Sequence, residues 1–471
     1  MAARLLQRSV GFSRYLKRGF ANVNVAAVPL TESLPGYDEL EQTQTEVKQE
    51  PVMVSSLSNG VKIASKEVPN SPYVSLGVYV KCGSRVEPYH KLGISHLLRH
   101  CAFLSTAEKT SYLLMREIEH LGGSLSCNTT REHMVYNATF LKGDQEHIIA
   151  SLCSRITDPS FRHYEVDEQK QYLKLNIDES SENPNIVVNE GLHRISFRNG
   201  LCNSLYSPSY NVDKFTSEDL EGFVRDWFIS PNVSVVGVGI DHNSLLKCAK
   251  PLTNLSESSG SAIAKSAYVG GGELRVDSGS PLAHVGIVCK GTSLYGPSES
   301  IAGVVQCLLG CGQRLKWGSG SASARLRKAV ARKIDDKFDI NAINIRYSDN
   351  GIFGFYAKAD GSIMGQVLQL AMAEFSEISK GNVDEADLTR AKNQYKADLL
   401  MGCDLLNDIG QQVSFTNKYT EISEKIKEID NVTSQDVVGF VKSVFATRPN
   451  VVSCGNLSTV PRLDELLTNL S

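Results

Sequence analysis

The sequence lacks a long apolar run. No stretch of 18 apolar residues occurs, and the longest candidates, such as VSVVGVGI at 233–240, have only the length of a β-strand. The sequence therefore contains no predicted membrane-spanning helix. If the chain belongs to a membrane assembly, we expect it to be attached through partner subunits.

An excess of basic residues is also absent. The 471 residues include 49 Lys and Arg against 52 Asp and Glu, which gives a formal net charge of −3. Nucleic-acid-binding proteins usually carry a basic footprint that contacts the phosphate backbone. The composition therefore argues against a nucleic-acid partner.

The N-terminal segment is the exception to this charge balance. Residues 1–20 contain five Arg and Lys, two Ser and no acidic residue. A helix of this segment separates its basic groups from its Leu and Phe side chains, which is typical of a mitochondrial transit peptide. The alternative is a basic amphipathic surface helix of the mature protein. Cleavage after Phe20 would remove five positive charges and change the net charge from −3 to −8.

Several sequence motifs are missing. The eleven cysteines form no C-x-x-C pair, and their odd number and scattered positions favour a reducing compartment. Only Cys307 and Cys311 lie four residues apart, and we interpret them as two small buried thiols on one helical face. Residues 310–330 are rich in Gly and Ser but do not contain a P-loop motif, so we expect a connecting loop there and not a phosphate site. No dinucleotide, haem or iron–sulfur motif occurs, and no cofactor is expected.

The chain contains an internal repeat. The segment AHVGIVCKGTS aligns with VSLGVYVKCGS so that Gly291 matches Gly83, 208 residues earlier, and the helical patterns that follow also align. Both halves combine strand-like alternation with helical periodicity. The repeat predicts an α+β fold with two homologous domains that arose by gene duplication.

The predicted domain boundaries follow from composition. We expect a transit peptide at 1–20 and an extended polar arm at 21–51, because the arm has no apolar period. The N-terminal domain then covers 52–253 and the C-terminal domain 273–471. A Ser- and Gly-rich linker at 254–272 separates them.

A histidine pair is the most informative local feature. In GISHLLRHCAFLST, His96 and His100 are four residues apart in a helical pattern, so both imidazoles lie on one face and are close enough to bind one Zn²⁺. A hydrolytic zinc site also needs a third ligand and a carboxylate that takes a proton from water. In the H-x-x-E-H motif this base precedes the second histidine, and here that residue is Arg99, which cannot lose its proton.

These residues resemble the pitrilysin-type metallopeptidase family. The resemblance implies two pitrilysin-like α+β domains, each an antiparallel or mixed sheet covered by helices, in a gene-duplicated clam arrangement. It also implies a third glutamate ligand on the helix YEVDEQKQYLKLNIDES, at the position of Asn176, with a supporting acidic position at Gln169. Glu179 on the same helix is about one turn, near 5 Å, from the ligand position. The resemblance therefore implies a degenerate site without catalysis and without an expected metal, although metal binding to the pair His96 and His100 stays open.

Within that family the chain is similar to the core subunits of mitochondrial respiratory complex III, ubiquinol–cytochrome c reductase. The similarity rests on stretches spread from 92 to 456, including TTREHMVYNATF, NSLYSPSY and RYSDNGIFGFY. It implies a non-catalytic structural subunit on the matrix side of the inner membrane that supports assembly and stability. The implied partners are the other core subunit, cytochrome b, cytochrome c1 and the Rieske protein, and a processed presequence peptide is a secondary hypothesis.

Three alternatives remain open at this stage. The chain is compatible with a subunit of the mitochondrial processing peptidase, a residual zinc metallopeptidase, or a free-standing peptide-binding protein of the matrix. The remaining isolated histidines are interpreted as surface or hydrogen-bonded structural residues and not as ligands. We also expect Arg99 to pair with an acid of the 163–179 helix, such as Glu165 or Glu168.

Overall fold

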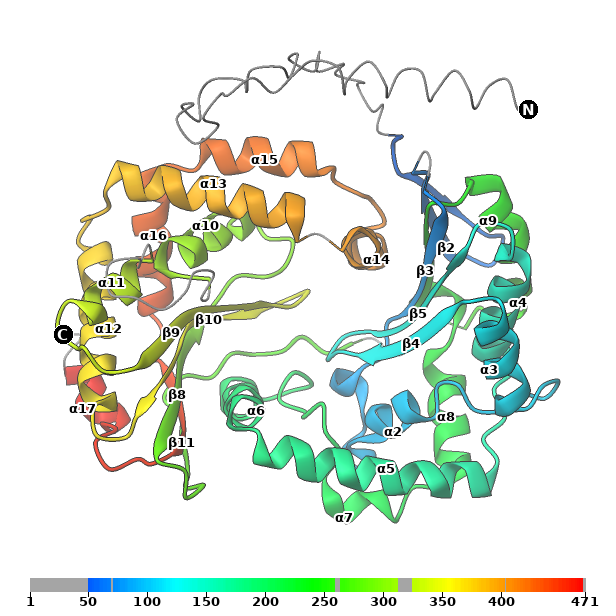
Figure 1. The fold of residues 1–471 in the computed structure, drawn as a ribbon, viewed down its shortest axis with the longest axis horizontal. Helices are drawn as coiled ribbons and strands as arrows, with labels where there is room; N and C mark the ends of the chain where they lie inside the picture. The colour runs from blue at the N-terminus through cyan, green and yellow to red at the C-terminus, as the bar shows by residue number, and fades with distance from the viewer. Residues whose placement is uncertain (1–49, 69–70, 259–262, 312–323, 403, 469–471) are drawn as a thin grey trace, which may run out of the picture. The chain divides into compact units, whose positions relative to one another are not determined.

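The computed structural model describes residues 50–68, 71–258, 263–311, 324–402 and 404–468. The predicted transit peptide, nearly all of the predicted arm and most of the Gly- and Ser-rich loop lie outside the described residues. The described part contains two sheets, each accompanied by helices (Figure 1). None of its helices has the length and apolar character that crossing a membrane requires.

The first sheet has six strands in the order β1-β2-β6-β3-β5-β4. Its strands are β1 (Met53–Ser56), β2 (Lys62–Lys66), β3 (Tyr73–Val80), β4 (Ser124–Thr129), β5 (Met134–Leu141) and β6 (Val233–Val238). Strand β2 pairs with β6 in parallel, and all other pairs are antiparallel. Strands β1 and β2 form a hairpin with Gly60 at φ 90° in the turn, where a side chain would be strained.

The second sheet repeats this arrangement with five strands in the order β7-β11-β8-β10-β9. Its strands are β7 (Glu273–Val276), β8 (Leu282–Lys290), β9 (Phe338–Arg346), β10 (Gly351–Asp360) and β11 (Asn450–Gly455). Again one pair, β11 with β7, is parallel and the others are antiparallel. The order β2-β6-β3-β5-β4 therefore has the same topology as β7-β11-β8-β10-β9, which confirms the α+β fold built from a duplicated unit.

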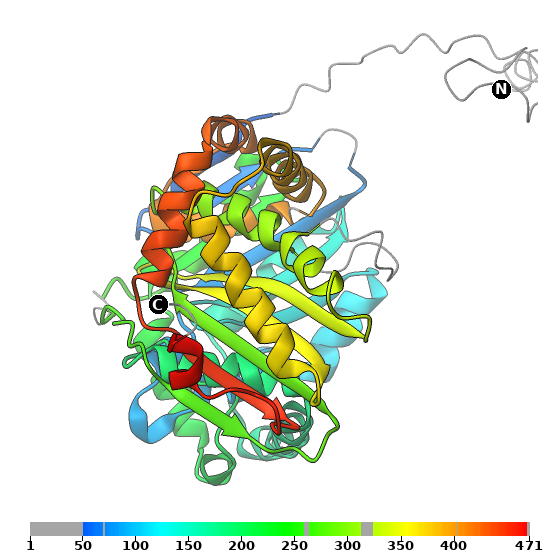
Figure 2. The same ribbon diagram turned by 90° about the vertical axis from the view of Figure 1, so that its left-hand side faces the viewer.

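Helices also occur in matching order in the two halves. The first half contains α2 (Ile94–His100), α3 (Ser111–His120), α4 (Gln145–Thr157), α5 (His163–Glu182), α6 (Pro184–Ser196), α7 (Ser209–Val212), α8 (Ser217–Trp227) and α9 (His242–Cys248). The second half contains α10 (Glu299–Leu309), α11 (Arg325–Ala331), α12 (Met364–Ser379), α13 (Glu385–Met401), α14 (Leu405–Thr416), α15 (Ile422–Asn431), α16 (Ser434–Phe445) and α17 (Leu463–Thr468). Figure 2 shows the yellow and orange helices of the second half over one face of its sheet.

Two corresponding helices start with the same local signal. Thr216 caps α8 and Thr433 caps α16, and in each case the side chain accepts a hydrogen bond from the backbone three residues later. Asp219 and Asp436 complete a reciprocal capping box by accepting from the backbone N–H of the threonine. The repeat is therefore visible at the level of single hydrogen bonds.

The two halves exchange one helix each. Helix α6 comes from the first half but packs on β8 and β11, where Val188 and Leu192 join Val288 and Val452 in one buried cluster. Helix α14 comes from the second half but packs on β3 and β6 of the first sheet. Central strands such as β8 are therefore buried on both faces, which explains their nearly continuous apolar sequence.

Helix α14 can pack on the first sheet because its backbone comes very close to β3. Gly410 on α14 lies directly over the ring of Tyr79 on β3, and a Cβ atom at Gly410 would be 2.1 Å from Cζ of that ring. The Tyr79 hydroxyl donates to the Leu406 carbonyl at 3.0 Å and to Asn407 Oδ1 at 2.7 Å. The ring thus fixes α14 by shape and by hydrogen bonding.

Charged residues also join the two halves. Arg85, buried in the first half, donates to Asp349 of the second half, with Nη1 to Oδ1 at 3.0 Å, and to Glu132. Glu132 also accepts from the backbone N–H of Ser348 at 3.0 Å. Because both carboxylates partner one buried guanidinium, the charges compensate one another.

Candidate degenerate metal site

Helix α2 is positioned by a buried carboxylate at its N-terminus. Glu87, 7% exposed, accepts from the backbone N–H of Gly93 at 2.7 Å and of Ser95 at 2.9 Å. A helix N-terminus has unpaired N–H groups and a partial positive charge, so a carboxylate stabilises it. Burial raises the pKa of Glu87 to about 7, against the opposing effect of these hydrogen bonds.

The turn that enters α2 requires glycine. Gly93 has φ 91°, and a Cβ atom there would be 2.3 Å from Oγ and 2.4 Å from Cα of Ser207. The segment around Ser207 therefore lies directly against the start of α2. This contact brings the Ser207 backbone N–H to the ring of His96.

His96 lies at the centre of a compact polar cluster. It is 1% exposed, and its Nδ1 accepts from the Ser207 N–H at 3.2 Å. Its Nε2 is 3.0 Å from Oδ1 of Asn176 on α5. Arg99 Nη2 lies 3.1 Å from the same Oδ1 and donates to it. The structure therefore brings together three of the residues singled out in the sequence, His96, Arg99 and Asn176.

These contacts fix the protonation of the His96 ring. Because the Ser207 N–H points at Nδ1, this nitrogen supplies a lone pair and the proton is on Nε2. The Nε2–H group then donates to Asn176 Oδ1. The Arg99 guanidinium lies 3.0 Å from Nε2, has no acceptor atom and is a second donor to the same oxygen. Both ring nitrogens of His96 are therefore engaged, and Nε2 has no lone pair to offer a metal in this tautomer.

His100 completes the pair on the same helical face. Its ring centroid is 5.2 Å from that of His96, and its buried Nε2 has no hydrogen-bond partner among the described residues. Burial and then the nearby Arg99 charge lower the pKa of His100 to about 4, and the same two causes lower the pKa of His96 to about 3. Both rings are therefore neutral at neutral pH, and the charge of the cluster is that of Arg99.

The other predicted positions on α5 take no part in the cluster. Gln169 is half-buried and Glu179 is exposed, and no hydrogen bond joins either of them to His96, Arg99 or His100 among the described residues. Among the described residues, no carboxylate is hydrogen-bonded to His96 or His100.

The expected ion pair of Arg99 with Glu165 or Glu168 is wrong. Arg99 instead donates to the neutral amide of Asn176, on the same helix α5. Glu165 is buried and accepts hydrogen bonds from Ser105, and Glu168 is exposed. The reason is distance along the helix, since Glu165 is 11 residues or about 16 Å before Asn176.

Three participants of the cluster were missed from the sequence. Glu87 acts from six residues before Gly93, which is not the spacing of a capping box. Ser207 contributes only a backbone N–H, and Tyr206 packs its ring edge-on to His96 with centroids 5.4 Å apart. The stretch NSLYSPSY contains both, but no side-chain pattern in it signals a contact with His96.

Three of the remaining histidines link elements of the fold. His193 Nδ1 donates to the Asn189 carbonyl, so its Nε2 accepts from the Tyr347 hydroxyl, at 2.8 Å, across the two halves. His242 contacts Ser55 at 2.9 Å and Ser65 at 2.8 Å, and His163 contacts Ser217 at 3.1 Å. Each of these rings joins two elements of the fold.

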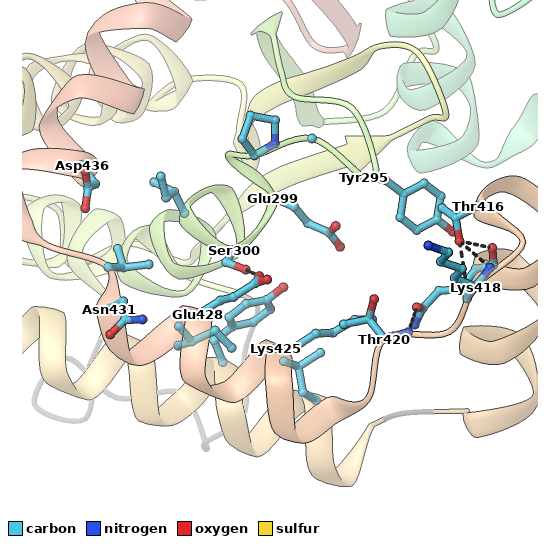
Figure 3. Close-up of a pocket in the computed structure, with 18 residues that line it drawn as sticks. Tyr295, Glu299, Ser300, Thr416, Lys418, Thr420, Lys425, Glu428, Asn431 and Asp436 are labelled. Carbon is cyan, nitrogen blue, oxygen red and sulfur yellow. Dashed lines mark hydrogen bonds between the residues drawn. The ribbon is translucent and has the colours of Figure 1, made fainter. Parts of the chain in front are cut away.

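A cavity of about 820 Å³ lies in the second half, between α10, α13, α14 and α15. Figure 3 shows Glu299, Tyr295 and Lys425 around it. Burial raises the pKa of Glu299, and Arg346 Nη1 lies 3.2 Å from its carboxylate. The mixture of acidic, basic and apolar walls does not match one class of ligand, and the histidine pair is not among its lining residues.

Two family models and full-length relatives match this chain. The family model described as insulinase (peptidase family M16) matches residues 62–209, and the model described as peptidase M16 inactive domain matches residues 214–395. Cytochrome b-c1 complex subunit 2, mitochondrial, of Rattus norvegicus is 35% identical over 467 residues, which cover 98% of this chain and 100% of the relative. The Homo sapiens protein of the same name is 34% identical over 469 residues, with the same coverage.

A second group of relatives is less similar. The probable mitochondrial-processing peptidase subunit alpha-1 of Arabidopsis thaliana is 30% identical over 423 residues, which cover 88% of this chain and 84% of the relative. The similarity to the subunits of the cytochrome b-c1 complex is thus both higher and more complete.

Proposed function

This chain belongs to the peptidase M16 family, and we propose that it is a non-catalytic structural core subunit of mitochondrial respiratory complex III, equivalent to core protein 2. The observation that carries the proposal is the match over 98% of the chain to subunit 2 of the cytochrome b-c1 complex. The chemistry of the cluster supports it, because Arg99 and Asn176 stand where a zinc peptidase needs carboxylates.

The proposal includes partners and location. The chain pairs with core protein 1 on the matrix side of the inner membrane and supports the subunits that carry redox groups, which are cytochrome b, cytochrome c1 and the Rieske protein. Electron transfer belongs to those partners. The role of this chain is to provide surfaces for assembly, and its N-terminal segment at 1–20 acts as the import signal that is removed.

A native gel of detergent-solubilised mitochondria tests the assignment. Antibody against the chain, or against a C-terminal tag, is expected to detect it at the size of complex III, together with cytochrome c1 in a second denaturing dimension. Migration of the whole pool as a free chain, or with a soluble peptidase partner, would contradict the proposal. Cleavage of presequence peptides by the purified chain with zinc would favour the peptidase alternative.

A second function is favoured by one observation. Strand β4 pairs with β5 on one side only and stands last in the order of the first sheet. A free strand edge offers N–H and C=O groups to an extended peptide. We propose that this edge holds a processed presequence peptide. Mass spectrometry of peptides extracted from the purified complex is expected to identify one, and a complex without any such peptide would rule this function out.

A further inference from the structure

Three potential metal ligands meet in the second half, away from the histidine pair. Cys307 lies on α10, Cys311 follows the end of that helix, and Asp398 lies on α13. Their two sulfur atoms and one carboxylate oxygen all lie within 4.8 Å of one another. The two Sγ atoms are 3.0 Å apart, and Cys307 Sγ is 3.9 Å from Asp398 Oδ2.

The end of α10 produces this convergence. Helix α10 stops at Leu309, and Gly310 takes φ 140°, a conformation that residues with a side chain rarely adopt. The chain therefore turns so that the Cys311 thiol returns to the Cys307 thiol. Cys307 is buried in the second core, whereas Cys311 and Asp398 are half-buried and form its accessible side.

The donor set suits one kind of cation. Zinc binds thiolates at about 2.3 Å and carboxylate oxygens at about 2.0–2.2 Å, so a tetrahedral ion separates two sulfurs by about 3.8 Å and a sulfur from an oxygen by about 3.5 Å. The Sγ–Sγ distance of 3.0 Å and the Sγ–Oδ2 distance of 3.9 Å each differ from these values by less than about 1 Å, which rotation of side chains can adjust. Two thiolates favour zinc over magnesium or calcium, which prefer oxygen ligands.

We propose that Cys307, Cys311 and Asp398 form a zinc-binding site. The three ligands carry three negative charges when deprotonated, so a divalent cation relieves their mutual repulsion. The ion joins α10 to α13, two helices that pack together in the second half. This site shares no residue with the cluster around His96.

The thiol pair has a competing chemistry. Two sulfurs this close can also form a disulfide, in which two thiols lose two electrons and two protons to an oxidant such as a second disulfide. A disulfide leaves no thiolate for a metal. Alkylation of protein purified under reducing conditions, both zinc-loaded and zinc-free, distinguishes the two chemistries. In the zinc-free protein both thiols react with the reagent if they are free, and neither reacts if they form a disulfide.

Metal titration of the full-length chain tests the proposal. The chain is reduced, stripped with a chelator, desalted and titrated with Zn²⁺ in competition with a chromophoric chelator. One zinc per chain is expected, and Co²⁺ in its place is expected to give a thiolate-to-cobalt charge-transfer band. Cys311→Ser and Asp398→Asn change half-buried ligands, and each is expected to weaken zinc binding by at least about 100-fold, since loss of even an outer partner of a metal ligand costs roughly 10–100-fold.

Two matched controls define the outcomes. Cys289→Ser removes a buried thiol from β8, outside the site, and is expected to bind zinc as the unchanged chain does. His100→Ala is expected to do the same. Absence of zinc binding by the unchanged chain, equal binding by Cys311→Ser, or zinc lost in His100→Ala would each overturn the proposal, as would alkylation showing a Cys307–Cys311 disulfide in the reduced preparation.

Discussion

Helices α2 and α10 follow corresponding strands of the two halves, but they differ in what they bury. Alignment of the halves matches His96 and His100 of α2 with Val304 and Leu308 of α10. Val304 and Leu308 have no exposed surface and belong to the second hydrophobic core. In α2 the matching side chains are imidazoles, and that of His96 contacts Arg99 and Asn176.

The difference shows two ways of filling one position in a duplicated fold. An apolar side chain is stabilised there by packing alone. A buried imidazole needs hydrogen-bond partners, and His96 has one at each ring nitrogen. Hydrogen bonds therefore account for the burial of His96, whereas the buried Nε2 of His100 has no partner among the described residues.

The largest predicted effect is a difference between α10 and α2 in how much side-chain packing contributes to stability. Leu308→Ala leaves a cavity in the second core and is expected to lower the free energy of unfolding by about 2–5 kcal/mol. His100→Ala at the matching place is expected to cost only about 1 kcal/mol, because the ring is half-buried and its Nε2 makes no hydrogen bond. Chemical denaturation of both variants measures the difference. Equal losses would contradict it.

The next prediction concerns pH and the carboxylate that caps α2. Folded Glu87 keeps its proton up to about pH 7, whereas the unfolded residue loses it near 4.5. The folded state therefore binds more protons in this window, and the contribution of Glu87 to stability falls as the pH rises from about 4.5 to 7.

Glu87→Gln removes this titration. Relative to the unchanged chain, the variant is expected to gain stability between pH 5 and 7.5, by a change on the order of 3 kcal/mol. Denaturation at several pH values measures the two slopes. Glu179→Gln, an exposed change on α5, is the control and should leave the slope as it is. Parallel curves for Glu87→Gln and the unchanged chain would contradict the prediction.

A smaller loss of stability is expected when Asn176, the hydrogen-bond acceptor of the cluster, is replaced. Asn176→Leu leaves the Nε2 proton of His96 and the Arg99 guanidinium without their shared acceptor, which is expected to cost about 1–3 kcal/mol. Gln171→Leu on the exposed side of α5 serves as the matched control and should change stability by less than about 0.5 kcal/mol. A cost of Asn176→Leu no greater than that of its control would show that the hydrogen bonds are not formed.

The smallest effect is electrostatic. Arg99→Gln removes the positive charge that contributes to the low pKa of His100, while the burial that dominates is retained. The pKa of His100 is therefore expected to rise from about 4 toward, but not up to, its ordinary 6.5. Nuclear magnetic resonance of histidine-labelled protein follows this titration. An unchanged pKa would place the guanidinium outside the cluster.

Local sequence signals predicted much of the fold but not its exchange of helices. The repeated strand and helix patterns of the two halves and the helix that carries His96 were predicted because hydrophobic periods act locally. The same periods assign a helix such as α6 or α14 an apolar face without stating which sheet covers it. Only the tertiary structure shows that each helix packs on the sheet of the other half.

The site was predicted in part for the same reason. The spacing of His96, Arg99 and His100 follows from one helix, and the family resemblance suggested Asn176. Contacts that depend on backbone atoms of a distant segment, such as the Ser207 N–H, leave no trace in side-chain chemistry. The prediction of an acidic partner for Arg99 was wrong because placing the partner on α5 does not fix where along that helix it lies.

Complementation with a histidine variant is the most direct test of the central claim that the chain acts by assembly and not by catalysis. In cells that lack the endogenous subunit, the chain carrying His100→Ala is expected to restore complex III on native gels, and ubiquinol–cytochrome c reductase activity, to the level of the unchanged chain. Loss of that activity, with the variant present in normal amount and stably folded, would show that the histidine pair has a chemical role and would contradict the account.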